Sequence, residues 1–104
     1  MKRTKVRISD VAGNDILEQA DWYKQRSGRT LAKRWERGVT AAALRIAKNP
    51  QSGSLCNFEA NELRAVRRMS IARFPKHLIF YRVDSGEVEI LRVIHGARDL
   101  ESLF

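Results

Sequence analysis

The spacing of apolar positions divides the chain into segments with strand-like and helical periods. Residues 5–9 alternate between apolar and charged side chains, which predicts a short half-buried strand. From Ser9 and Asp10, an N-cap followed by a first-turn acid, apolar residues recur at helical spacing as far as Ser27-Gly28. The chain is therefore predicted to begin with one strand and one helix.

A second, more strongly amphipathic helix is predicted after Thr30, which is a suitable N-cap. Its apolar stripe is spaced by four, four, three and four residues, and the helix stops at Asn49-Pro50. The stripe consists of Leu31, Trp35, Val39, Ala42 and Ile46. We interpret the other face as solvated; it carries Lys33, Arg34, Arg37, Arg45 and Lys48.

The later part of the chain has the period of strands. Residues 50–61 are typical of a loop, Phe74-Pro75 marks a break, and Asp84-Ser85-Gly86 is a hairpin turn signal. Three strands are predicted between these signals, at residues 63–70, 77–83 and 87–95.

The predicted element order is β-α-α-β-β-β, in one domain over residues 1–104. This order defines an α+β fold in which a two-helix hairpin packs on a small, mainly antiparallel sheet. Residues 78–81 and 90–94 are apolar on both faces of that sheet, and the hairpin covers only one of them. The second face is covered either by residues 100–104 folding back or by a partner chain, and the pattern leaves both open.

Composition narrows the classes of function. The 104 residues include 20 Lys and Arg against 12 Asp and Glu, a net charge of +8, which favours nucleic acid, an acidic protein segment or an anionic membrane surface as partner. The single cysteine, Cys56, excludes an internal disulfide and is typical of a reducing compartment. No segment has the apolar length of a signal peptide or a membrane span, so we expect a soluble cytoplasmic protein that has no membrane partner.

Basic side chains are concentrated between Leu63 and Arg82, where no acidic residue occurs. With Arg92 and Arg98 they are expected to form a cluster suited to phosphate or carboxylate, unless strand alternation scatters them over different faces. The basic residues of that stretch are Arg64, Arg67, Arg68, Arg73, Lys76 and Arg82.

His77 and His95 are candidate general acids or bases, because an imidazole titrates near neutrality. Their spacing matches no metal-binding motif, and Cys56 lies in a predicted loop. The chain also has no Gly-rich phosphate loop and no nucleophile turn. We therefore expect neither a metal nor a cofactor.

Two C-terminal segments, residues 73–83 and 87–99, closely resemble the RelE/ParE superfamily of bacterial toxins. The runs Phe-Tyr-Arg-Val and Leu-Arg-Val-Ile-His-Gly-Ala-Arg-Asp are similar to the ParE-like members, and residues 9–23 match more loosely. The resemblance implies two helices against a small antiparallel sheet, which agrees with the element order above.

The resemblance also implies the toxin of a type II toxin-antitoxin pair, held in a hetero-oligomer by an antitoxin whose acidic C-terminal segment wraps it. We expect antitoxin contact at Ile79, Tyr81, Leu91, Val93, Arg34 and Arg37. We expect contact with the cellular target at Arg64, Arg67, Arg68, Arg73, Arg92 and Arg98.

The superfamily divides by activity: RelE-like members cut messenger RNA on the ribosome, and ParE-like members poison DNA gyrase. Arg98 matches the family's late arginine, but Leu78 takes the place of a sheet arginine and Phe104 stands near that of a terminal tyrosine. These departures favour gyrase inhibition without catalysis. Alternatively, the protein is a ribosome-dependent endoribonuclease in which His77 or His95 acts with Arg98, or a degenerate toxin that only binds its antitoxin or nucleic acid.

Overall fold

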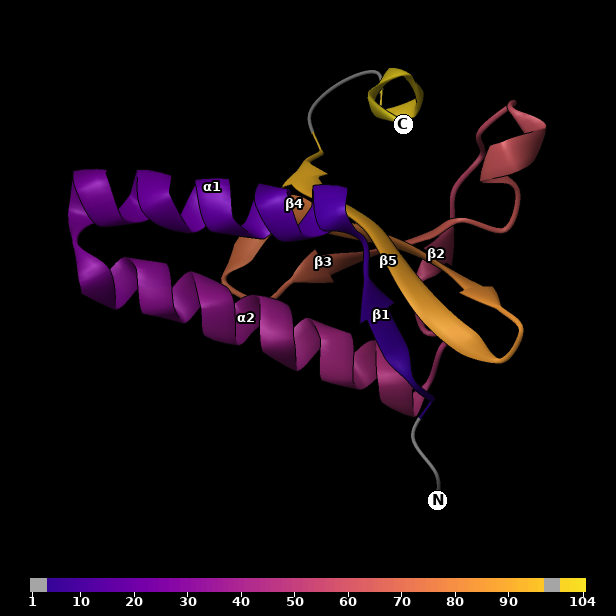
Figure 1. Ribbon diagram of the computed structural model, residues 1–104, viewed down its shortest axis with the longest axis horizontal. Coiled ribbons are helices and arrows are strands. Elements are labelled where there is room, and N and C mark those ends of the chain that lie inside the picture. Colours follow the sequence, from indigo (N-terminus) through magenta and orange to yellow (C-terminus); the bar gives the residue numbers. More distant parts are fainter. Residues whose placement is uncertain (1–3, 97–99) are drawn as a thin grey trace.

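The computed structural model describes residues 4–96 and 100–104 and arranges them as a helix pair against one sheet (Figure 1). Within these residues the sheet has five strands in the order β1-β5-β4-β3-β2; β1 is parallel to β5 and the other neighbours are antiparallel. The elements are β1 (Val6–Ile8), α1 (Asp10–Ser27), α2 (Arg29–Lys48), β2 (Ser54–Leu55), β3 (Arg67–Ile71), β4 (Phe74–Asp84) and β5 (Glu87–His95), with short 3-10 turns at Asn61–Leu63 and Glu101–Leu103. The predicted α+β fold with a helix hairpin on a mainly antiparallel sheet is confirmed.

Three predictions for the second half of the chain are wrong: the start of one strand, the loop without a strand, and the break at Phe74-Pro75. The predicted strand at residues 63–70 begins only at Arg67, after a 3-10 turn and after Ala65 adopts a positive φ of 62°. The segment predicted as a loop contains β2, which is too short to show a period. Phe74 and Pro75 belong to β4, and the turn before them is made by Arg73 at a φ of 72°.

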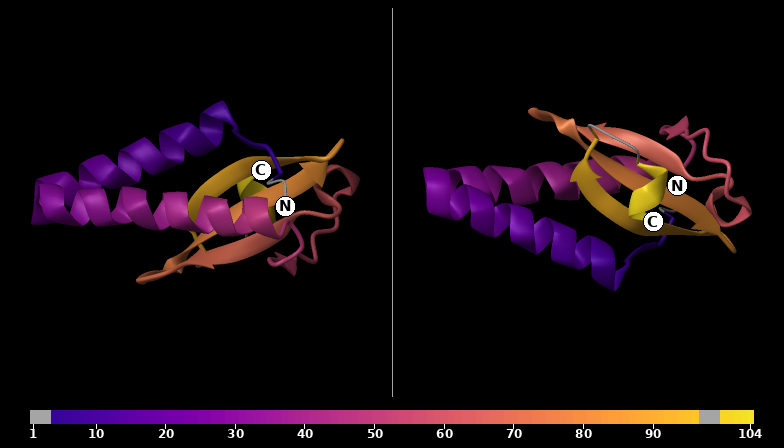
Figure 2. Two further views of the ribbon diagram at one scale, coloured as in Figure 1. Left: turned by 90° about the horizontal axis from the view of Figure 1, so that it is seen from below. Right: turned by 90° about the horizontal axis from the view of Figure 1, so that it is seen from above.

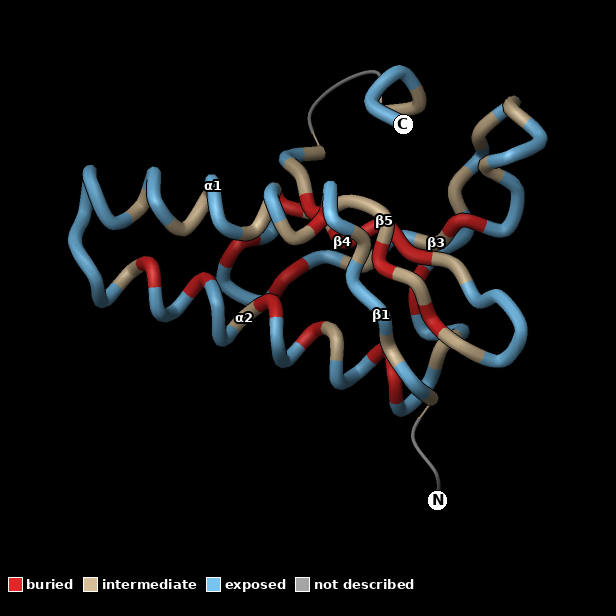
Figure 3. The backbone as a smooth tube through the Cα atoms, viewed as in Figure 1, coloured by how far each residue is buried: buried red, intermediate tan, exposed pale blue. Residues whose placement is uncertain are grey.

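The main core lies between the α2 stripe and the helix-facing side of the sheet. Trp35, Ala42 and Ile46 are fully buried against Ile79 and Tyr81, and the Trp35 indole N–H donates to the Ile16 carbonyl of α1 at 3.1 Å. Burial follows the predicted stripe along α2, whereas the hairpin end of the helix pair is largely exposed and extends beyond the sheet (Figure 3). No helix in the described residues is long and apolar enough to cross a membrane.

The start of α1 takes the place of an edge strand where β1 ends. The Ser9 backbone N–H donates to the Ile90 carbonyl at 3.0 Å, and the Ser9 hydroxyl donates to the Leu91 carbonyl at 3.1 Å. The same hydroxyl oxygen caps α1 by accepting from the Ala12 N–H at 3.0 Å. One side chain therefore both begins the helix and fastens it to β5.

The C-terminal segment covers part of the second face of the sheet. Figure 2 shows α2 in front of the sheet in one view and the C-terminal turn in front of it in the opposite view. Phe80 is fully buried on this face, with the rings of Phe104 and Phe58 centred 5.4 and 6.3 Å from its own. Of the two alternatives for covering this face, the structure shows the chain's own tail over Phe80.

Tyr81 ties the core to the loop that follows α2. Its hydroxyl donates to the Pro50 carbonyl and accepts from the Gly53 N–H, both at 2.8 Å. An added Cβ at Gly53 would lie 2.5 Å from that hydroxyl oxygen and 2.8 Å from the Arg68 carbonyl oxygen. Only glycine therefore allows the loop to approach so closely.

Replacing Trp35 with alanine is expected to lower the free energy of unfolding by about 3–5 kcal/mol, because a fully buried indole and its packing are lost. Trp22→Ala is the matched control, since that indole is 49% exposed and its loss is expected to be below about 1 kcal/mol. Urea denaturation monitored by circular dichroism gives both values. Equal losses for the two variants would contradict the observed helix register.

Candidate functional site

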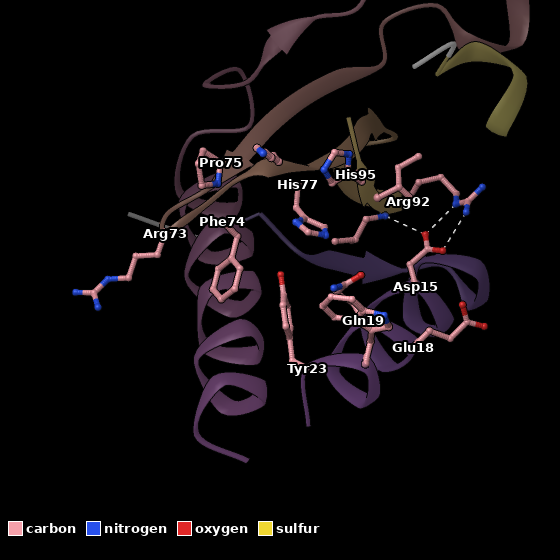
Figure 4. Close-up of a pocket in the computed structure, with 14 residues that line it drawn as sticks. Asp15, Glu18, Gln19, Tyr23, Arg73, Phe74, Pro75, His77, Arg92 and His95 are labelled. Atoms are coloured by element: carbon pink, nitrogen blue, oxygen red, sulfur yellow. Dashed lines mark hydrogen bonds and ion pairs between the residues drawn. The ribbon is translucent and has the colours of Figure 1, made fainter. Parts of the chain in front are cut away.

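An open groove of about 820 Å³ lies between α1, the first residues of β4 and the last residues of β5 (Figure 4). Asp15, Gln19 and Tyr23 line its α1 wall, and His77 and His95 line the sheet wall. The groove exists because β1 ends early, so that α1 and not a strand faces the last turns of β5.

Asp15 and Arg92 form the strongest ionic contact of this wall. Arg92 donates from Nε to Asp15 Oδ2 at 2.8 Å and from Nη2 to Oδ1 at 3.0 Å, a bidentate pair in which the side chains are 21% and 11% exposed. Asp15 Oδ2 also accepts from the Val93 backbone N–H at 3.0 Å, and Arg92 Nη1 donates to the Leu103 carbonyl. The hydrogen bond to Asp15 raises the pKa of Arg92 further above its ordinary range. Arg92, predicted to contact a target, thus joins β5, α1 and the C-terminal tail.

His77 and His95 face each other across the β4–β5 pair. They are directly opposite in the strand register, with ring centroids 5.3 Å apart. His77 is only 9% exposed and packs on Trp35, with the two ring centroids 4.8 Å apart. His95 is exposed. Burial lowers the pKa of His77 below its ordinary value of 6.5, and the neighbouring His95 lowers it further, so that His77 is neutral at neutral pH.

The structure divides the described members of the predicted arginine cluster: the strand register places Arg68 and Arg92 on one face, on either side of Phe80, and other members elsewhere. Arg67 and Arg68 are consecutive on β3 and point to opposite faces, and Arg67 is held by the Gln51 and Gly53 carbonyls. Arg64 is exposed after a 3-10 turn, and Arg73 extends away from the histidine pair in Figure 4. Arg98 lies outside the described residues.

The residues predicted to contact an antitoxin divide between the interior and the surface. Ile79, Tyr81 and Val93 belong to the buried core under the helices, so their side chains do not form an open sheet face. Leu91 is half-buried beside the register shift at Phe80/Tyr81, and the α2 arginines are exposed. Of this set, the side chains at the surface are therefore Leu91 in part, Arg34 and Arg37.

The described residues contain no group of three or more side chains placed to hold a metal ion. Cys56 is half-buried beside β2; burial raises its thiol pKa, and Arg68 opposes that effect only in part. A protonated thiol is a poor nucleophile and a poor metal ligand.

Sequence reasoning missed the α1 wall of the groove. Asp15 and Gln19 are polar residues on a helix with no motif, and only the tertiary contact of α1 with β5 gives them a role. Tyr23 lines the groove and also packs on Trp35, with the two ring centroids 6.0 Å apart. No local signal in the sequence distinguishes these positions from an ordinary helix surface.

The fold and the family comparison define a toxin of a type II toxin-antitoxin system. Residues 6–100 match the family model described as the ParE toxin of the type II toxin-antitoxin system parDE. Because that match spans most of the sequence, the chain belongs to the ParE toxin family. No curated protein is similar enough in sequence to count as a match.

Two solved structures share this fold. The chromosomal ParDE toxin-antitoxin system from P. aeruginosa aligns with a TM-score of 0.75 and 18% identity, over 91% of this chain and 98% of that chain. The RelBE2 toxin-antitoxin complex from Mycobacterium tuberculosis aligns with a TM-score of 0.60 and 20% identity, over 91% and 93%. The likeness to both the ParDE and RelBE2 structures confirms the predicted superfamily fold.

Replacing Asp15 with alanine is expected to lower the free energy of unfolding by about 2–4 kcal/mol, because the Arg92 guanidinium and the Val93 N–H both lose their acceptor. Glu18→Gln, on the same helix and lining the same groove, is expected to change it by less than about 0.5 kcal/mol. Denaturant unfolding of these variants, of Arg92→Ala and of the Asp15/Arg92 double variant measures the coupling energy between Asp15 and Arg92. Additive losses for Asp15 and Arg92 would contradict a shared contact.

Proposed function

We propose that this chain inhibits DNA gyrase and that a cognate antitoxin with an acidic C-terminal segment neutralises it in a hetero-oligomer. The observation that carries the proposal is the match of residues 6–100 to the ParE toxin family. Action on gyrase would also place the protein in the cytoplasm, in agreement with its single free cysteine.

The arrangement of candidate acid–base groups supports gyrase inhibition over RNA cleavage. Cleavage of RNA requires a base, an acid and cations around one phosphate. His77 and His95 lie side by side in the groove, but Arg92, which lines the same groove, is engaged by Asp15. Phe104, which stands near the place of a terminal tyrosine, covers Phe80 on the other face of the sheet. A phosphate at the histidine pair would therefore lack the cation that Arg92 could otherwise supply.

Binding of the target is assigned to the arginines that have no partner of their own. The side chains of Arg64, Arg68 and Arg73 are exposed and make no hydrogen bond or ion pair to any other described residue. The whole chain has a net charge of +8. These three arginines would therefore help to attract the toxin to an acidic surface of gyrase or to the DNA that gyrase holds. Arg98 is retained as a target contact from the sequence motif. The proposed mechanism is tight binding that traps the enzyme, without proton transfer by the toxin.

Antitoxin binding is assigned to the exposed face of α2 and to the partly exposed Leu91. Arg34 and Arg37 are one helical turn apart and exposed, so acidic side chains of an antitoxin segment could pair with both. Ile79, Tyr81 and Val93 would then contribute by supporting the sheet from within and not by direct contact.

Purified toxin added to gyrase and relaxed plasmid is expected to block supercoiling and to accumulate linear DNA. Addition of the antitoxin before the toxin is expected to restore supercoiling. The same preparation is expected to leave messenger RNA intact in a translation extract, as read by primer extension. Codon-linked cuts in the message with normal supercoiling would refute the proposal in favour of the ribonuclease, and no effect in either assay would favour a toxin that only binds its antitoxin.

Exchanging arginines in two separate sets tests the assignment of the two surfaces. Serine at Arg64, Arg68 and Arg73 is expected to weaken gyrase inhibition roughly tenfold or more, because three surface ionic contacts of about 0.5 kcal/mol each are lost. Serine at Arg34 and Arg37 is expected to weaken antitoxin affinity and to leave gyrase inhibition unchanged. Supercoiling titrations and calorimetric antitoxin binding measure the two effects. The assignment fails if both sets reduce both properties equally.

A further inference from the structure

The only two histidines of the sequence, 18 positions apart, are brought face to face at the mouth of the groove. We propose that His77 and His95 together bind a divalent transition-metal ion of the class that prefers imidazole ligands, such as Zn²⁺, Ni²⁺ or Cu²⁺. This inference does not rest on the proposed action on gyrase.

The separation of the two rings is that of imidazoles sharing one metal ion. A nitrogen–metal bond of about 2.0–2.1 Å, with the ring centre roughly 1 Å further on, places two ring centres about 5 Å apart at a tetrahedral angle. The observed separation is 5.3 Å, with the ring planes at 80°. The opposed register of β4 and β5 holds both side chains at this distance without a backbone change.

The ring nitrogens of His77 make no hydrogen bond to another described residue, and the residue is 9% exposed. These nitrogens are not among the fully buried unpaired side-chain atoms of the described residues, so a ligand that enters the groove can reach them. A metal ion bound there would contact His77 and also give the exposed His95 a partner.

The α1 wall beside the histidine pair offers oxygen ligands to a small cation. Glu18 lines the same groove, and Figure 4 shows the Gln19 amide and the Tyr23 hydroxyl directed from α1 towards the histidine pair. Arg73 is directed away from the pair, and Arg92 is neutralised by Asp15. Lys76 also lines the groove, so a cation is expected to bind here through the two imidazoles and the oxygens of the α1 wall and not through an excess of negative charge.

The site offers two protein ligands, in keeping with the absence of any group of three or more metal-ligating side chains in the described residues. Water would complete the coordination sphere, with the Gln19 carbonyl oxygen as one candidate for a further ligand. Occupation would join β4, β5 and the α1 wall at the end of the groove.

The test uses the full chain, untagged, with Zn²⁺ followed by calorimetry and Cu²⁺ by electron paramagnetic resonance. We expect one Zn²⁺ per chain, a rise in the thermal unfolding temperature, and a Cu²⁺ spectrum with coupling to two imidazole nitrogens. Because the second imidazole is already held in place, His95→Ala is expected to weaken binding roughly tenfold or more and to leave one coupled nitrogen. His95 is exposed, so this variant keeps the fold.

Cys56→Ser is the matched control, since it removes the single thiol of the sequence and is expected to leave binding unchanged. The proposal is overturned if no saturable binding occurs up to roughly 1 mM Zn²⁺, an affinity of about −4 kcal/mol. It is equally overturned if His95→Ala binds as the parent does, or if Cys56→Ser abolishes binding. None of these metal-binding measurements involves gyrase, so a negative result would not contradict the proposed function.

Discussion

The contact between the Asp15 carboxylate and β5 is the constraint on which the groove depends. An edge strand presents N–H groups that no neighbouring strand pairs, and β1 stops before it can pair with the end of β5. Asp15 accepts from the Val93 N–H and pairs with Arg92, so that a helix completes the edge in place of a strand. This substitution leaves space between α1 and the sheet, and that space is the groove.

The predicted fold succeeded where the information is local. The α2 stripe around Trp35 repeats with the period of a helix, and its burial depends only on that period. The strand limits near Ala65 and Arg73 were missed because both residues adopt positive φ angles that their side chains do not favour. Tertiary packing imposes these turns, so the local sequence does not reveal them.

The sequence indicates which residues are candidates for the site, but it does not indicate which of them lie close together. His77 and His95 were recognised as candidate acid–base groups, yet their proximity depends on the strand register. Asp15 carries no motif, and strand alternation and a register shift at Phe80/Tyr81 decide which face each arginine or apolar side chain occupies. The arrangement of the site therefore depends on contacts between residues far apart in the sequence, which the local pattern does not reveal.

The aromatic group formed by Phe58, Phe80 and Phe104 has a consequence for how partners reach the sheet. Phe80 lies outside the buried cluster beneath the helices, so this group is a second, smaller hydrophobic assembly on the opposite side. A ligand that displaced the C-terminal tail would gain an aromatic binding surface while the helix-backed core stayed folded. Such a ligand would have to bind Phe80 more tightly than the tail does, because the two would compete for the same aromatic surface.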